Sequence, residues 1–195
     1  MVYLHELEAG ILLFLQSIRQ DFLSAFLVPL TYACEHGEVW LVLSLVLLCF
    51  RRTRKAGALA LLSMLLCWGS SELLVKILVQ RQRPFTVIEG LVPAVAPPRS
   101  FSFPSGHSCC SLSAAGTHWR LLKNRPLRWG VLVVALLIAF SRLYLGVHYP
   151  TDVLVGSLWG WFGSGLVVRI FSPRWDKRME QRARKKAGNN YYSGK

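Results

Sequence analysis

The amino-acid sequence predicts an all-α protein, a polytopic membrane helical bundle with about six transmembrane helices. Hydrophobic residues make up 53% of its 195 residues, and they gather in long apolar runs separated by short polar joints. A chain of this length has room for one compact domain. We therefore divide it into a single membrane domain, residues 1–172, and a basic cytoplasmic tail, residues 173–195.

The amino-terminal runs are the shortest. Residues 3–18 mix Leu, Ile and Phe with Glu6 and Glu8, a pattern typical of a helix that lies in the membrane interface. Two further runs, 22–34 and 39–50, are short for spans, and whether they cross the bilayer completely is left open.

The remaining runs reach or approach the roughly 20 residues that cross a hydrocarbon core. They cover residues 56–79, 107–122, 129–147 and 152–171. Between the first two lies a segment, 80–104, that holds five of the nine prolines. Because proline cannot continue a helix, this segment is predicted to be a loop, and it is expected on the extracytoplasmic side.

The formal net charge of +13 could indicate a nucleic-acid partner. The positions of the basic residues argue against this interpretation. Basic residues cluster at 51–55, at 120–128 and from Arg169 to the carboxyl end, and the predicted spans put these three clusters on one side. The positive-inside rule makes that side cytoplasmic. Topology and anionic lipid explain such clusters, so we expect the lipid bilayer as partner and no nucleic acid.

Topology does not explain the basic residues of the opposite side. With Arg19 set aside, these are Lys76, Arg81, Arg83, Arg99 and Arg142. Several of them flank two polar stretches, FSFPSGHS at 101–108 and SRLYLGVHYPTD at 141–152. Arginine forks and a lysine charge suit phosphate oxygens, and a glycine at a helix start lets backbone N–H groups approach an anion. The pattern predicts a phosphate site on this membrane face.

The second stretch also carries reactive groups. Asp152 follows His148 by four residues, so within a helical turn its carboxylate can reach one imidazole nitrogen. That contact fixes the tautomer and leaves the other nitrogen free to attack phosphorus. His107 is the available second histidine, which can give a proton to the leaving oxygen.

Three motifs together resemble the type-2 phosphatidic-acid phosphatases, relatives of the vanadium haloperoxidases. The family signature is Lys-x6-Arg-Pro, Pro-Ser-Gly-His and Ser-Arg-x5-His-x3-Asp. This chain has KILVQRQRP at 76–84, PSGH at 104–107 and SRLYLGVHYPTD at 141–152. All spacings match, and the resemblance extends over about 76–171.

The resemblance implies a role for each motif residue. The phosphate would be held by Lys76, Arg83, Ser105, Gly106 and Arg142. His148 would attack phosphorus to give a phosphohistidine, Asp152 would orient it, and His107 would protonate the departing oxygen. The family's phosphatases use no metal, and we expect neither a metal nor another cofactor.

The expected function is that of a metal-independent lipid phosphate or pyrophosphate phosphatase in the plasma membrane, multi-pass, with its active site facing the extracytoplasmic side. Undecaprenyl pyrophosphate is the first candidate substrate, followed by phosphatidylglycerol phosphate and phosphatidic acid. An anion-binding transporter is the non-enzyme alternative. The oligomeric state is left open.

The roles of three charged residues also stay open at this point. Glu72 lies within a predicted span, where an ionisable group is costly and is usually buried against a partner. It is interpreted either as a buried structural group or as part of the substrate cleft. Arg81 and Arg99, taken singly, are interpreted as interfacial cations.

Overall fold

The computed structural model describes residues 2–35 and 37–193, and within these ranges every regular element is helical. The prediction of an all-α protein is confirmed. In chain order, with η1 a π-helical turn, the elements are α1 (Val2–Ser17), α2 (Asp21–Tyr32), α3 (Glu38–Cys49), α4 (Arg54–Ser70), η1 (Ser71–Val75), α5 (Lys76–Val79), α6 (Pro84–Val87), α7 (Gly106–Leu121), α8 (Arg125–Tyr144) and α9 (Pro150–Ser193).

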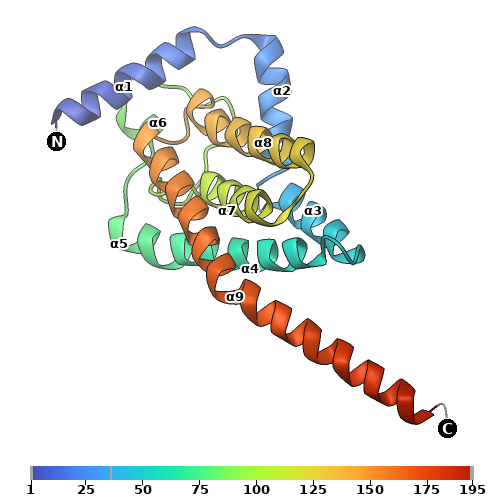
Figure 1. Ribbon diagram of the computed structural model, residues 1–195. Coiled ribbons are helices and arrows are strands. Elements are labelled where there is room, and N and C mark those ends of the chain that lie inside the picture. The colour runs from blue at the N-terminus through green and yellow to red at the C-terminus, as the bar shows by residue number, and fades with distance from the viewer. Residues whose placement is uncertain (1, 36, 194–195) are drawn as a thin grey trace.

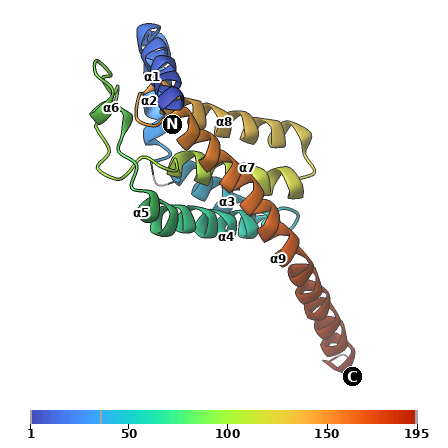
Figure 2. The ribbon, with the colours of Figure 1, turned by 90° about the vertical axis from the view of Figure 1, so that its left-hand side faces the viewer.

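Helix α7 forms the centre of the bundle, with α4, α8 and α9 packed around it (Figures 1 and 2). Nearly all of its residues from Gly106 to His118 are buried. Its sequence, GHSCCSLSAAGTHWRL, is rich in Ser, Gly, Ala and Cys. Small side chains allow neighbouring helix backbones to approach closely, so a sequence of moderate hydrophobicity occupies the middle of the protein.

A core of apolar side chains joins the short helix α3 to this centre. Trp40 of α3 is almost fully buried and donates a 2.9 Å hydrogen bond from Nε1 to Ser111 Oγ of α7. The same cluster contains Leu112 of α7 and Ile138 of α8. A buried indole needs such a polar partner, and here the partner fixes α3 against α7.

Three segments are long and apolar enough to cross a membrane: Arg54–Val87, Arg125–Tyr144 and Pro150–Arg182. Helices α1 and α2 meet at 116° and together would make a fourth, broken span. The predicted count of about six spans is therefore not confirmed. The 12-residue α3 is about 18 Å long, short of a hydrocarbon core of about 30 Å, and α7 is enclosed by protein.

The predicted loop and the predicted tail differ in their secondary structure, and the side of the membrane on which each lies stays a prediction. Residues 80–104 are mostly non-helical apart from α6, and backbone hydrogen bonds such as Ala94 N to Leu145 O (3.0 Å) tie them to the bundle. The expected tail is a continuation of α9, which runs through Pro173 and points away from the bundle (Figure 1). Lys55 Nζ contacts Asp176 at 2.6 Å across α4 and α9. Residues 194–195 of the tail lie outside the described part.

The close approach of α7 and α9 gives a stability prediction. A Cβ at Gly160 would collide with the carbonyl oxygen of Cys109 and would lie 2.8 Å from Ser113 N. Both obstacles are backbone atoms of α7, so the helices would have to move apart. We expect Gly160→Ala to lower the free energy of unfolding by about 1–3 kcal/mol, the usual cost of overpacking, as measured by thermal unfolding in detergent.

The matched control is Gly130→Ala in α8, where a Cβ would meet nothing within 4 Å. Alanine has the higher helix propensity, so this variant should unfold at the wild-type temperature or above it. Equal unfolding temperatures for the two variants would contradict the close packing of α7 against α9.

Candidate active site

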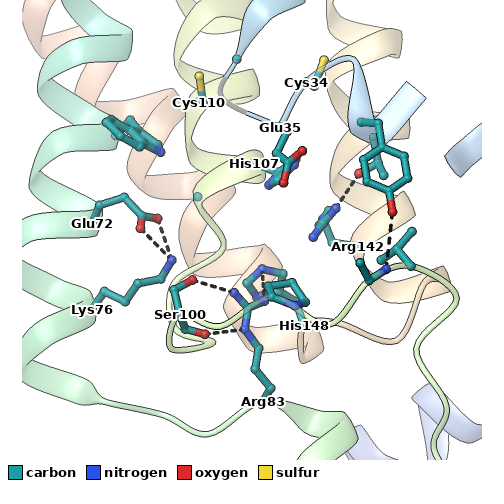
Figure 3. A pocket seen from close by; sticks show the side chains of 18 residues that line it. Cys34, Glu35, Glu72, Lys76, Arg83, Ser100, His107, Cys110, Arg142 and His148 are labelled. Carbon is teal, nitrogen blue, oxygen red and sulfur yellow. Dashed lines mark hydrogen bonds and ion pairs between the residues drawn. The ribbon is translucent and has the colours of Figure 1, made fainter. Parts of the chain in front are cut away.

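A pocket of about 240 Å³ opens where α4, α7, α8 and the segment 80–104 meet. Figure 3 shows Lys76 and Arg142 approaching from opposite sides, with His148 between them. The residues from the predicted site that line the pocket are Lys76, Arg83, Gly106, His107, Arg142 and His148. Residues from three motifs, separated by tens of positions in sequence, therefore meet around one space.

Arg83 is buried and contacts the predicted nucleophile directly. Its Nε donates to the carbonyl oxygen of Ser100 at 2.8 Å, and its Nη1 donates to that of Val147 at 2.8 Å. The same Nη1 lies 2.9 Å from His148 Nε2. A guanidinium has no acceptor, so Nε2 must accept. In this structure the imidazole therefore carries its proton on Nδ1.

Asp152 lies behind that proton. Its Oδ2 lies 3.4 Å from His148 Nδ1, an electrostatic contact without hydrogen-bond geometry, because this Nδ1 has no hydrogen-bond partner in the described part of the chain. The same Oδ2 accepts hydrogen bonds from the Tyr149 N–H (2.9 Å) and from Ser102 Oγ. The turn that brings these groups together contains Gly146 at φ 72°, a backbone conformation that glycine adopts without steric cost. Asp152 then stands in the first turn of α9, where a carboxylate interacts favourably with the helix dipole.

The environment of His148 favours the neutral ring. Burial lowers the pKa of this imidazole well below its usual value, and the nearby cations Arg83, Arg142 and Lys76 lower it further. Adding a proton to His148 would place another positive charge beside these cations, and the buried ring has little contact with solvent that could stabilise it. A neutral imidazole has the free electron pair that a nucleophile requires.

Arg142 retains unused hydrogen-bonding capacity. It stands in the last turn of α8, is 4% exposed, and donates from Nη1 to Thr31 Oγ1 at 2.5 Å. Its buried Nε has no hydrogen-bond partner in the described part of the chain. Among the described residues no carboxylate forms an ion pair with Arg142 or with Arg83. Buried charges are normally paired, so the pocket presents positive charge that an anion can neutralise.

Lys76 is held by the residue whose role the sequence left open. Its Nζ contacts both carboxylate oxygens of Glu72, at 2.7 and 2.9 Å. Glu72 also lines the pocket, which favours the second of its two interpretations. Both residues belong to the π-helical turn η1 or directly follow it. Such wide turns often occur at functional sites.

The start of α7 brings Gly106 and His107 to the pocket but turns the Ser105 hydroxyl elsewhere. Ser105 is the N-cap of α7. Its buried Oγ accepts from Ser108 N at 3.4 Å and from Ser108 Oγ at 2.9 Å, and Ser105 is not among the residues that line the pocket. Its predicted contact with phosphate stays a prediction.

Sequence reasoning missed several polar contacts of the site. Thr31, Ser100 and Ser102 bond to Arg142, Arg83 and Asp152 respectively. Thr31 lies in α2, and Ser100 and Ser102 lie in the segment 80–104. Single Ser and Thr residues carry no recognisable pattern, so no signal in the sequence could have found them. Within the described chain, no group of three or more His, Cys, Asp and Glu side chains could hold a metal ion. Metal-independent catalysis stays a prediction.

Fold and site together define a class: a helical membrane protein with two histidines in a cationic pocket suited to phosphate. Residues 56–176 match the family model described as the PAP2 superfamily. The chain belongs to this superfamily, as the three motifs predicted.

Individual relatives agree with this assignment. The chain is 34% identical to an undecaprenyl-diphosphatase of Sulfolobus acidocaldarius over 78% of its own length and 74% of the relative's. A PAP2-type phosphatidylglycerolphosphate phosphatase from Bacillus subtilis superposes with a TM-score of 0.64 at 29% identity, covering 89% of this chain and 86% of that one. The fold also matches LpxE of Aquifex aeolicus, with a TM-score of 0.72 at 23% identity over 82% and 93% of the two chains. The protein is thus a membrane lipid phosphatase, a hydrolase.

The unpaired charge of Arg142 gives a prediction on anion binding. Arg142→Lys keeps the charge but loses the planar fork, so turnover should fall roughly ten- to a thousandfold, as on losing one preorganised donor. Vanadate, a mimic of the phosphoryl-transfer geometry, should inhibit the variant much less than the wild type. Arg99→Lys, a change in an exposed loop residue, should leave both values unaltered. Unchanged vanadate inhibition of Arg142→Lys would contradict a role in holding the anion.

Proposed function

We propose that the protein hydrolyses a lipid phosphate or pyrophosphate through a phosphohistidine formed on His148. The observation that carries this proposal is the position of His148, whose neutral ring lies in a pocket with Arg83 and Arg142 and has Asp152 behind it. The pocket would bind a phosphate group by charge, and the imidazole would then attack it.

The first step begins with the exchange of one hydrogen bond. Arg83 donates to His148 Nε2, and this bond occupies the electron pair needed for attack. A phosphate oxygen offers Arg83 a charged acceptor, and charge-assisted hydrogen bonds are the stronger ones. Substrate would therefore draw the guanidinium away from Nε2. Arg142, Lys76 and the backbone at Gly106 would complete the phosphate site.

The chemistry then follows in two balanced steps. Burial and the neighbouring cations lower the pKa of His107, so His107 would take up its proton together with the substrate, whose negative charge offsets those cations. His148 Nε2 then forms a bond to phosphorus while the bond from phosphorus to the leaving oxygen breaks, and the protonated His107 gives that oxygen its proton. A water molecule next attacks the phosphohistidine, gives its proton to His107, and releases inorganic phosphate as His148 regains its electron pair. Asp152 faces the positive charge that develops on the ring, and the cations face the charge on the phosphoryl oxygens.

Undecaprenyl diphosphate is the first candidate substrate, supported by the similarity to the undecaprenyl-diphosphatase of Sulfolobus acidocaldarius. Phosphatidylglycerol phosphate is the second, supported by the similarity to the phosphatidylglycerolphosphate phosphatase of Bacillus subtilis. The pocket residues would contact the phosphate and not the lipid tail, so they do not separate the two substrates by themselves.

Phosphate release by the purified protein across a lipid panel tests this function. The panel contains undecaprenyl diphosphate, phosphatidylglycerol phosphate and phosphatidic acid, each assayed with EDTA present. We expect turnover of at least one lipid, unaffected by the chelator. Absence of turnover on all of them would favour an anion-binding transporter. Activity lost in EDTA and restored by Mg²⁺ would overturn the metal-independent mechanism.

Two histidine variants test the roles within the same assay. His148→Ala should fold and show no detectable hydrolysis, because no phosphoenzyme can form. His107→Ala should lose most activity on lipids yet still form a phosphoenzyme with a substrate whose leaving group needs no proton. Near wild-type turnover by His148→Ala would exclude it as the nucleophile.

We also propose that the protein crosses the plasma membrane several times, with its pocket facing the extracytoplasmic side. The support is the charge asymmetry, since the joints at 51–55 and 120–128 are basic and basic joints stay in the cytoplasm. A carrier lipid diphosphate presented on the outer face would then reach the pocket without leaving the bilayer.

Cysteine labelling in intact cells measures this sidedness. In a background without the native cysteines, a Cys placed within 85–99 should react with an impermeant maleimide. A Cys placed at 52–54 or at 180 should react only after the cells are opened. The reverse pattern would place the pocket on the cytoplasmic side and remove the carrier-lipid proposal.

A further inference from the structure

Arg81, whose role the sequence left open, bridges two buried carboxylates. Its Nη1 donates to Asp152 Oδ1 at 2.7 Å, and its Nη2 donates to Glu8 Oε2 at 2.5 Å. Asp152 is fully buried, and Glu8 of α1 is 2% exposed. A buried carboxylate is costly unless it is paired, so each acid depends on this one guanidinium.

The bridge is held in place by further contacts. Thr151 Oγ1 lies 2.7 Å from Arg81 Nη1, and its backbone N–H and hydroxyl both contact Glu8 Oε1, at 3.0 and 2.6 Å. The guanidinium carbon lies 3.7 Å from the ring centre of Tyr149, a cation–π contact. These neighbours belong to the start of α9 or directly precede it, so the bridge ties α1 to the turn that carries His148 and Asp152.

Arg81 is not placed to bind the phosphate. It is not among the residues that line the pocket of His148, whereas Arg83, two positions later, lines it. The two carboxylate oxygens of Asp152 contact different residues. Oδ1 accepts a hydrogen bond from Arg81, while Oδ2 lies 3.4 Å from His148 Nδ1. Arg81 therefore reaches the reacting imidazole only through Asp152.

Charge explains why a second acid is needed. Arg81 alone beside Asp152 would cancel the negative charge that faces His148. With Glu8 on the other side of the guanidinium, the three groups together keep one negative charge. The imidazole becomes positive when it forms its bond to phosphorus. The remaining negative charge stabilises this positive ring, because opposite charges interact strongly away from water.

We propose that Arg81 is a positioning residue, held by Glu8 of α1, which fixes Asp152 behind the nucleophile. The inference rests on the proposed role of His148. It makes the amino-terminal helix part of the catalytic machinery, although Glu8 lies outside residues 56–176, which match the family model. Removing either partner should slow the chemical step and leave phosphate binding intact.

The kinetic test uses Arg81→Gln and Glu8→Gln, which keep approximate size and remove one charge each. Their matched controls are Arg99→Gln and Glu6→Gln, exposed residues of the same loop and the same helix. With undecaprenyl diphosphate as substrate, kcat should fall about ten- to a hundredfold in the two test variants, by analogy with the loss of a residue that orients a metal ligand. The controls should stay at wild-type kcat.

Inhibition by inorganic phosphate separates positioning from binding. The inhibition constant should change less than about threefold in Arg81→Gln, because removing a true phosphate ligand would weaken binding about tenfold or more. An inhibition constant that rises as much as kcat falls would make Arg81 a phosphate ligand and overturn the proposal. The double variant should be no slower than Arg81→Gln alone, because Glu8 acts through Arg81; additive losses would also overturn it.

A spectroscopic test needs no turnover, so its result does not depend on whether the proposed function is correct. In ¹⁵N-histidine-labelled protein in micelles, the His148 signals are assigned by comparison with His148→Ala. The Nδ1 signal should shift in Arg81→Gln and Glu8→Gln and stay in place in both controls. His118, buried in α7, reports whether the fold is intact. An unmoved Nδ1 signal in a folded Arg81→Gln would overturn the proposal, whatever lipid the protein hydrolyses.

Discussion

The burial of unpaired positive charge around His148 is the constraint on which the rest of the structure depends. Taking a guanidinium out of water costs several kcal/mol unless polar groups replace the water. Backbone carbonyls and hydroxyls supply this replacement: Ser100 and Val147 for Arg83, and Thr31 for Arg142. These partners are neutral, so they satisfy hydrogen bonds without cancelling the charge, which remains available to a phosphate group.

Glu35 lines the pocket and its charge acts on Arg142, whereas three other carboxylates of the region are bound to cations other than Arg83 and Arg142. Glu72 is bound to Lys76, and both Glu8 and Asp152 are bound to Arg81. The fold thus pairs Glu8 and Asp152 with Arg81 behind the nucleophile, while Arg83 and Arg142 in the pocket form no ion pair among the described residues. Long segments are needed for this, since Glu8 comes from α1 and its contacts lie more than 70 residues away in sequence.

The fold class followed from the sequence because apolar runs and helix-breaking prolines are local properties. The number of spans did not, because an apolar run of limited length can face either lipid or protein. Residues 107–122 are predicted to cross the bilayer, and because α4, α8 and α9 surround α7, most of its side chains contact protein. Whether an apolar helix faces lipid or protein depends on the helices packed around it, and these come from other parts of the chain. The 116° bend between α1 and α2 is a tertiary feature of the same kind.

For the site, the sequence by itself determined which residue types gather: motif spacing predicted that Lys76, Arg83, His107, Arg142 and His148 would meet, and they line one pocket. Only the tertiary structure decided what each side chain contacts there. It turned the Ser105 hydroxyl toward Ser108, and it placed Arg81 between Glu8 and Asp152. The spacing of residues in the sequence determines which side chains are neighbours within one helical turn. Contacts between distant segments depend on how whole helices pack, and no local sequence pattern predicts that packing.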